Sequence, residues 1–255
     1  MKKYIEELIK NYVNNYGNIK SVKTKYREPL VAFASADDEE FAKLKHIVSP
    51  SHMLPKDFLE DAKTVVCYFI PFDESIVQSN IEGKESSEAW AVAFVETNEM
   101  MGNLNNYIKN NLEQNGYHCS AVPLAYNFDR DKLISDWSQR HVAFIAGLGT
   151  FGLNNMLITE KGCCGRFASV VTNLSLEPSD KKLKEHCLYK ANNTCKKCVK
   201  RCVNDALKED SFDRKKCNEM CLHNDKLYPD VGFSDVCGKC LVGVPCSFIS
   251  PIKDK

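Results

Sequence analysis

The segment TCKKCVKRC, residues 194–202, holds three cysteines within nine positions. The chain has 255 residues and 13 cysteines, of which four precede residue 180 and the other nine lie between residues 187 and 246. This uneven distribution predicts a cysteine-poor domain over residues 1–180, followed by a cysteine-dense module over residues 181–255.

The N-terminal segment argues against secretion, and therefore against a disulfide scaffold. It reads MKKYIEELIKNYVNNYG, and it carries charges where a signal peptide has an apolar run. Its apolar residues recur at helical spacing, which predicts an amphipathic helix that ends at Gly17. No segment reaches the roughly 18 apolar residues of a membrane span, and 34 Lys and Arg balance 34 Asp and Glu. We therefore expect a cytoplasmic protein with reduced thiols.

The spacing of the clustered cysteines favours iron–sulfur clusters. Cys-x2-Cys-x3-Cys in residues 195–202 matches the last three ligand positions of the bacterial ferredoxin run, whose closing cysteine binds the other cluster of a pair. Zinc is the competing interpretation, because Cys-x2-Cys pairs also form zinc ribbons. One four-thiolate zinc site would leave several suitably placed cysteines unused, whereas eight of them fit two 4Fe-4S clusters.

The crossed ligand pattern of two-cluster ferredoxins predicts which thiols belong together. Cluster 1 is assigned Cys187, Cys195, Cys198 and Cys246. Cluster 2 is assigned Cys202, Cys217, Cys237 and Cys240. Because the motif CNEMC places Cys221 four positions after Cys217, these two cysteines could exchange roles. The adjacent Cys163 and Cys164 are interpreted as non-ligands, since neighbouring side chains do not easily bind one cubane.

The first 180 residues alternate between strand-like and helix-like segments. Apolar and β-branched runs predict strands over residues 64–70, 117–128 and 167–173. Helical periodicity predicts helices over residues 86–114 and 129–146. These segments predict one α/β (α+β) domain with a compact appended module.

A glycine-rich segment, AGLGTFG in residues 146–152, follows the second predicted helix. Its G-x-G-x-x-G spacing would suit a nicotinamide loop only with a strand before the glycines and a helix after them. Here a helix-like segment precedes the glycines and the strand-like MLIT follows, so nicotinamide is disfavoured. Glycines also allow a backbone to approach a large flat ligand, and a tight turn without a ligand is the alternative.

Together these motifs resemble a known family. AGLGTFG, followed by CGRFASVVTNLSLEP and a double-cluster module, is similar to the epoxyqueuosine reductases and their cobalamin-dependent relatives, which include reductive dehalogenases. HMLPKDFLEDAKTVVCYFIPF, residues 52–72, resembles the start of their catalytic domain. The resemblance covers about residues 45–250.

The resemblance implies a nitroreductase-like domain that binds base-off cobalamin, with a ferredoxin-like module carrying the two 4Fe-4S clusters. A low-potential donor of the ferredoxin or flavodoxin type would supply electrons, which pass through the clusters to cobalt and then to the substrate. Asp136 is the candidate proton donor, with a surface or helix-capping role as the alternative. The residues expected to contact cobalamin are Arg140, Gly147, Leu148, Gly149, Thr150, Phe151, Gly152 and Arg166. For the two arginines, helix capping and a solvent salt bridge are the alternatives.

Two departures from the family pattern bear on the substrate. Leu153 stands where the family commonly has a lysine, and the helical-repeat extension of many epoxyqueuosine reductases is not found. We therefore expect a small or nucleoside-like substrate, with tRNA possible but not favoured. The alternative function is a non-enzymatic 4Fe-4S electron-transfer protein or corrinoid-reducing partner, and a flavin in the same pocket is a third. Residues 181–201, with eight Lys or Arg and one Glu, favour docking of an acidic electron donor over nucleic acid.

Overall fold

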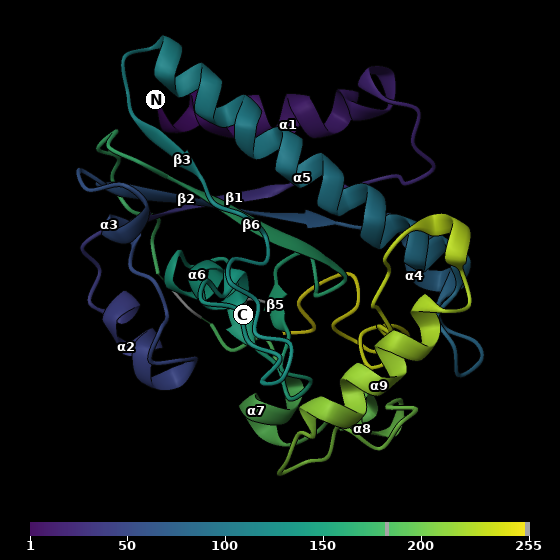
Figure 1. Ribbon diagram of the computed structural model, residues 1–255. Coiled ribbons are helices and arrows are strands. Elements are labelled where there is room, and N and C mark those ends of the chain that lie inside the picture. The colour runs from purple at the N-terminus through teal and green to yellow at the C-terminus, as the bar shows by residue number, and fades with distance from the viewer. Residues whose placement is uncertain (182–183, 253–255) are drawn as a thin grey trace.

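A four-stranded antiparallel sheet lies at the centre of the protein (Figure 1). The computed structural model describes residues 1–181 and 184–252. The strands lie in the order β1 (Leu30–Ser35), β2 (Thr64–Pro71), β6 (Gly165–Thr172) and β3 (Cys119–Ala121), and each neighbouring pair is antiparallel. A separate antiparallel hairpin consists of β4 (Gly149–Phe151) and β5 (Leu157–Thr159).

Helices cover both faces of the sheet and form most of the regular structure of the C-terminal module. They are α1 (Lys2–Ile19), α2 (Glu40–Ile47), α3 (Pro55–Phe58), α4 (Glu74–Ser79), α5 (Glu88–Gln114), α6 (Gln139–Ile145), α7 (Leu188–Asn192), α8 (Lys197–Lys200), α9 (Arg214–Asp225) and the 3-10 turn η1 (Pro229–Val231). In Figure 1, α1 and α5 lie on one side of the sheet, and α2, α3 and α6 lie on the other. Among the described helices, none has both the length and the apolar character needed to cross a bilayer.

Strand β2 explains how one sheet supports two hydrophobic cores. All eight of its residues are buried. Val65, Cys67 and Phe69 pack in the core that contains α2 and α6 residues, whereas the alternate residues pack against α1 and α5. Because successive side chains of a strand point to opposite faces, a strand buried on both sides reads as the unbroken apolar run found in the sequence.

The strands predicted over residues 64–70 and 167–173 and the long helix are confirmed, with small shifts of their ends. The helix predicted over residues 129–146 is wrong in its first half, because α6 begins only at Gln139. The Asp129 carboxylate accepts backbone N–H groups of Asp131 and Lys132, and Leu133 has a φ of 56°. These contacts form a turn that competes with helix formation.

Two other predicted boundaries also differ from the structure. The strand predicted over residues 117–128 is limited to β3, and Pro123, which lacks an N–H donor, follows soon after it. The N-terminal helix continues through Gly17 to Ile19.

The cysteine-dense module packs directly on the domain that precedes it. One hydrophobic cluster joins Trp90 of α5 and Ile158 of β5 with Leu241 and Val242 near the end of the chain. The domain boundary near residue 180 stays a prediction, because this cluster draws its residues from both sides of that position.

Candidate functional site

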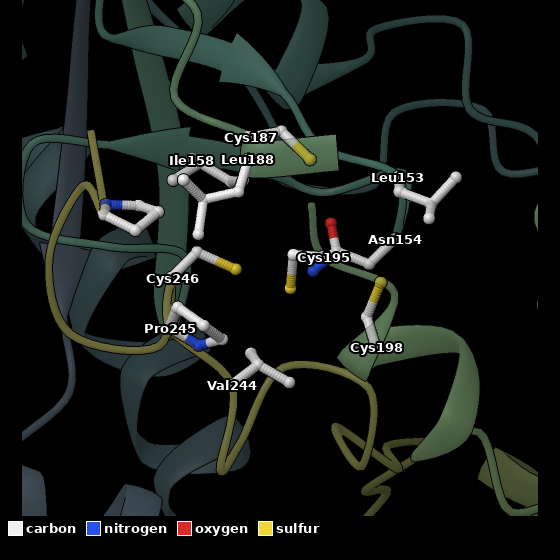
Figure 2. A pocket seen from close by; sticks show the side chains of 11 residues that line it. Leu153, Asn154, Ile158, Cys187, Leu188, Cys195, Cys198, Val244, Pro245 and Cys246 are labelled. Carbon is white, nitrogen blue, oxygen red and sulfur yellow. The ribbon is translucent and has the colours of Figure 1, made fainter. Parts of the chain in front are cut away.

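Four cysteines line one pocket between the β4–β5 hairpin and the C-terminal module (Figure 2). They are Cys187, Cys195, Cys198 and Cys246, the residues assigned to cluster 1. Cys187 and Cys198 are buried, and the other two are half-buried. The remaining wall is largely apolar and includes Leu153, Ile158, Leu188, Val244 and Pro245. In Figure 2 the four thiol side chains surround a common space.

The pocket is not a ready-made site for a single ion. Over residues 1–181 and 184–252, no group of three or more His, Cys, Asp or Glu side chains is arranged to hold a metal ion. The structure brings the four thiols to one pocket, but it does not arrange them around a metal position. Their assignment as cluster ligands stays a prediction.

The β4–β5 hairpin holds the segment that carries Cys187. The Thr150 hydroxyl donates to Glu185 Oε1 at 3.1 Å and accepts the backbone N–H of His186 at 2.9 Å. Glu185 Oε1 also accepts the Cys187 N–H at 2.7 Å. Thr150 of AGLGTFG thus fixes the first thiol of the pocket.

The turn between β5 and β6 holds the segment that carries Cys246. The Cys163 N–H donates to the Cys246 carbonyl at 2.9 Å, and the Cys164 N–H donates to the Ser247 carbonyl at 3.3 Å. Gly162 allows this approach, because it has a φ of +85° and a Cβ there would lie 2.4 Å from the Ser247 oxygen. The turn GCCG therefore docks the last thiol of the pocket.

Arg27 connects the same closing segment with the sheet. Its guanidinium donates to the backbone carbonyls of Phe72 at 3.0 Å, Lys161 at 2.7 Å and Phe248 at 2.9 Å. Burial lowers the pKa of Arg27. A half-buried cation that satisfies three carbonyls is a structural support.

The cysteines assigned to cluster 2 also lie near one another. Burial raises the pKa of Cys240, and the nearby thiols of Cys237, Cys217 and Cys202 raise it further. The Leu207 N–H donates to the Cys202 sulfur at 3.3 Å. Cys221 shares a hydrogen bond with Cys217, so the choice between these two ligands stays open.

A second cavity, the arginine groove, opens between α6, β6 and the loop that precedes α6. Its volume is about 400 Å³. Apolar side chains form much of its wall, and its cationic residues are Arg140, Arg166 and Arg214. Arg140 is half-buried and lies near Cys217 and Cys240, so its side chain connects the groove with the second group of thiols.

Two buried nitrogen atoms of groove residues have no partner in the described part of the chain. They are Arg166 Nε and Gln139 Nε2. The Arg166 guanidinium lies 4.2 Å from the centre of the Phe94 ring, and burial lowers its pKa to about 10. Buried donors without partners cost free energy, so these atoms point to a ligand with acceptor oxygens.

The residues predicted to bind cobalamin separate into two groups. Arg140 and Arg166 line the arginine groove, whereas Gly147, Leu148, Gly149, Thr150, Phe151 and Gly152 are not among its lining residues. A Cβ at Gly149 would lie 2.1 Å from the carbonyl oxygen of Ile158 in β5. The close approach of β5 within the chain's own hairpin therefore accounts for this glycine.

Asp136 lies outside the lining of the groove. Its carboxylate accepts the Ser51 hydroxyl at 2.5 Å, and its carbonyl accepts the Met53 N–H at 2.8 Å. Beside it, His52 Nε2 accepts the Ser138 N–H at 3.0 Å. These bonds hold the loop that leads into α6, and the role of Asp136 as a proton donor stays a prediction.

Several site residues were not found from the sequence. Gln139 and Arg214 line the groove, and the Cys163 N–H donates to the Cys246 carbonyl. Arg214 has a weak sequence signal, because a cation close to cysteines often balances thiolate charge. Gln139 and Cys163 have none, because their roles depend on contacts between distant segments.

Comparisons with known proteins identify the fold. No protein-family model matches the chain, and no curated protein sequence matches it. Among solved structures, the epoxyqueuosine reductase of Streptococcus thermophilus is 16% identical with a TM-score of 0.53, over 97% of this chain and 69% of that one.

Two further solved structures agree with it. Bacillus subtilis epoxyqueuosine reductase, in a form whose catalytic loop is swung out of the active site, is 16% identical with a TM-score of 0.52, over 95% of this chain and 66% of that one. An epoxyqueuosine reductase bound to an epoxyqueuosine-modified tRNA-Tyr stem loop is 17% identical with a TM-score of 0.51, over 95% of this chain and 66% of that one. The chain thus spans about two thirds of the length of the structures it matches. It has the fold of the epoxyqueuosine reductases, which its sequence motifs predicted.

Proposed function

We propose that the protein is a cobalamin- and iron–sulfur-dependent reductase that acts on a queuosine precursor. The observation that carries this proposal is the gathering of Cys187, Cys195, Cys198 and Cys246 around one pocket, in a fold shared with epoxyqueuosine reductases. The clusters would supply single electrons, and the corrinoid would supply a strongly reducing metal. In this proposal the sheet and its helices form the nitroreductase-like domain, and the module is ferredoxin-like.

The residues present fit two clusters. The pocket lined by Cys187 has a largely apolar wall, which suits a cluster whose sulfur ligands are shielded from solvent. The second group has a backbone N–H directed at the Cys202 sulfur and the half-buried Arg140 cation nearby. Both features stabilise negative sulfur ligands.

The arginine groove offers donor groups that suit cobalamin. At about 400 Å³ its volume lies within the usual range of a small-molecule site. Arg166 Nε and Gln139 Nε2 are buried donors without partners among the described residues, and the amide oxygens of a corrin are matching acceptors. Since Arg140 lies between the groove and the second thiols, cluster 2 would be the one closer to the corrinoid.

The comparison with a tRNA-bound reductase weakens the expectation that tRNA is disfavoured. That protein binds an epoxyqueuosine-modified tRNA stem loop, and this chain matches about two thirds of its length. We therefore propose epoxyqueuosine within a tRNA stem loop as the first substrate to test, and the free nucleoside as the second. Removal of the epoxide oxygen as water would consume two electrons and two protons.

A basic surface beside cluster 1 fits an acidic electron donor. Lys190, Lys197 and Lys200 are exposed on and next to α7 and α8, close in sequence to the half-buried Cys195. None of these three lysines forms an ion pair with a described residue, whereas Lys196 pairs with Glu209 at 2.6 Å. Lys182, which belongs to the same basic run, lies outside the described residues. Electrons would then enter at cluster 1 and leave through cluster 2.

The test begins with anaerobic purification in the presence of hydroxocobalamin, followed by quantitation of iron, sulfide and cobalt. The proposal expects about eight irons per chain, stoichiometric cobalt, and conversion of the modified stem loop to queuosine under a low-potential reductant. Cys198→Ala should lower the iron content to about four, whereas the matched control Cys119→Ala, a buried strand cysteine outside both thiol groups, should leave it unchanged. Eight irons without cobalt would favour the electron-transfer alternative, and zinc without iron would overturn the proposal.

A further inference from the structure

Lys239 is a buried lysine in the motif CGKC, between the proposed cluster 2 ligands Cys237 and Cys240. Only 1% of its surface is exposed. Its ammonium group donates to the backbone carbonyls of Asn80 at 2.9 Å and Glu82 at 2.6 Å. Both partners are neutral oxygens, and Lys239 forms no ion pair with an acidic side chain of residues 1–181 or 184–252. Its charge is therefore buried without an anionic partner in the described part of the chain.

Lys239 and its neighbours bind the loop between α4 and α5. The Asn80 side chain, which is fully buried, donates to the Cys237 carbonyl at 2.9 Å, so Asn80 binds both the lysine and a proposed ligand. Arg201, which directly precedes another proposed ligand, donates to the carbonyls of Ile81 at 2.6 Å and Lys239 at 3.1 Å. These hydrogen bonds hold the segments of three proposed cluster 2 ligands against one loop.

A buried cation is costly unless an opposite charge compensates it. The two carbonyl oxygens satisfy hydrogen bonds of Lys239 but carry no net charge. A 4Fe-4S cluster with four thiolate ligands is an anion in both of its redox states, and the motif places one thiol of the proposed cluster 2 on each side of this lysine in the chain. Cluster 2 is therefore the anion that suits the buried charge.

We propose that Lys239 is a positioning residue that holds the ligand loop of cluster 2 and raises the reduction potential of this cluster through its buried positive charge. This inference rests on the proposed function, because it requires the cluster.

The expected change has a definite sign. Reduction adds one negative charge to the cluster, so a nearby cation stabilises the reduced form more than the oxidised form. With an effective dielectric constant of about 20, a unit charge about 12 Å from the added electron changes the reduction equilibrium about tenfold. A tenfold change for one electron corresponds to about 59 mV. Removal of the Lys239 charge should therefore make cluster 2 harder to reduce.

Lys197 provides a matched control within the chain. It directly precedes Cys198 of cluster 1, just as Lys239 directly precedes Cys240 of cluster 2, but the side chain of Lys197 is exposed. Water and salt screen an exposed charge. The two lysines therefore share a position in the motif and differ in burial.

The experiment compares Lys239→Met, Lys239→Gln, Lys239→Arg and Lys197→Met with the wild-type protein, all purified anaerobically with hydroxocobalamin. Iron and sulfide are quantified first, and each cluster is then titrated reductively at moderate salt while electron paramagnetic resonance is recorded. We expect an equilibrium shift of about tenfold against reduction of one cluster in the two neutral Lys239 variants. Lys239→Arg keeps the charge and should shift less, and Lys197→Met should leave both midpoints unchanged. Because Cys198→Ala should retain only cluster 2, the shift caused by Lys239→Gln should persist in that background.

Three results would overturn the inference. Unchanged midpoints in the neutral Lys239 variants with full iron would show that the charge does not act on a cluster. An equal shift in Lys197→Met would show that burial is not the cause, and loss of the shift in the Cys198→Ala background would assign it to cluster 1.

Two further outcomes are separable from these. If Lys239→Met loses iron because two carbonyls are left unpaired, Lys239→Gln and Lys239→Arg decide, since both keep a donor: a smaller shift in the arginine variant supports the charge, and equal shifts contradict it. Absence of iron from the wild-type protein would end the proposed function itself, and no variant is needed to see it.

Discussion

Substitution of Gly162 by alanine should detach the closing segment of the chain and remove cluster 1. Gly162 has a φ of +85°, and a Cβ built there lies 2.4 Å from the Ser247 oxygen and 2.6 Å from the Phe248 carbonyl carbon. Gly116, at the end of α5, provides a matched control. Its φ is +82°, and nothing lies within 4 Å of a Cβ at that position. The two substitutions therefore share the backbone strain and differ only in the steric clash.

The structure gives the size of the difference. An alanine in the left-handed region costs about 1–2 kcal/mol at either position. Ordinary contacts to a Cβ begin at 3.4 Å, so in Gly162→Ala the closing segment must move away. This movement breaks the bonds from the Cys163 and Cys164 N–H groups to residues 246 and 247, which are 2.9 and 3.3 Å long. At about 1 kcal/mol for each hydrogen bond, Gly162→Ala should cost about 2 kcal/mol more than Gly116→Ala.

The assay measures iron per chain and the thermal unfolding midpoint at one scan rate. Gly116→Ala should keep about eight irons and lose a few degrees of midpoint. Gly162→Ala should hold about four irons, because Cys246 no longer reaches its cluster. Equal iron contents and equal midpoints for the two variants would refute the reasoning, since the clash would then have no consequence.

Three further predictions concern the pKa of a histidine, the donor surface and the arginine groove. Burial and the nearby Arg140 charge lower the pKa of His141 to about 4. The folded state therefore holds this histidine neutral, and the stability that this provides is lost as pH falls from 6.5 towards 4. Nuclear magnetic resonance of ¹³C-labelled histidines should find the titration midpoint of His141 near pH 4, and a midpoint near 6.5 would contradict the burial argument. Lys197→Glu combined with Lys200→Glu should slow reduction of the clusters by an acidic ferredoxin several-fold at low salt and much less at high salt. Reduction of the clusters by dithionite should be unaffected. Equal slowing at every ionic strength would exclude an electrostatic docking surface. Arg166→Met should weaken hydroxocobalamin binding by about tenfold or more with no loss of iron, and unchanged affinity in a cobalt titration would place the corrinoid elsewhere.

The sequence predicted the elements whose pattern is local. Strand β2 is an unbroken apolar run because both of its faces are buried, and α5 follows Ser87, whose hydroxyl accepts the Trp90 N–H. The first half of the helix predicted before α6 failed for an equally local reason. Asp129 satisfies two backbone donors in a turn, and helical periodicity alone does not register this competition.

The roles of the glycine motifs were not predictable in the same way. G-x-G-x-x-G suggested backbone close to a ligand, and in the structure Gly149 lies against β5. Gly162 of GCCG, to which the sequence analysis gave no role, lies against the closing segment. The contact of Gly162 joins segments that are far apart in the sequence. The contact of Gly149 lies within a hairpin whose register is set by packing. Spacing between glycines identifies where a backbone is approached closely, but it does not identify what approaches.

The thiols of cluster 1 depend on the domain before the module for their placement. Thr150 of the β4–β5 hairpin holds the segment of Cys187, and the turn at Cys163 holds the segment of Cys246. The first and last thiols of the pocket are therefore positioned by two motifs of the preceding domain, whereas Cys195 and Cys198 come from the module itself. Because the hydrophobic cluster of Trp90, Ile158 and Leu241 covers the same junction, packing of the module and completion of the thiol set are one event. In the proposed enzyme, this coupling would fix the position of cluster 1 relative to the arginine groove, and electron transfer between them would not require the two parts to move.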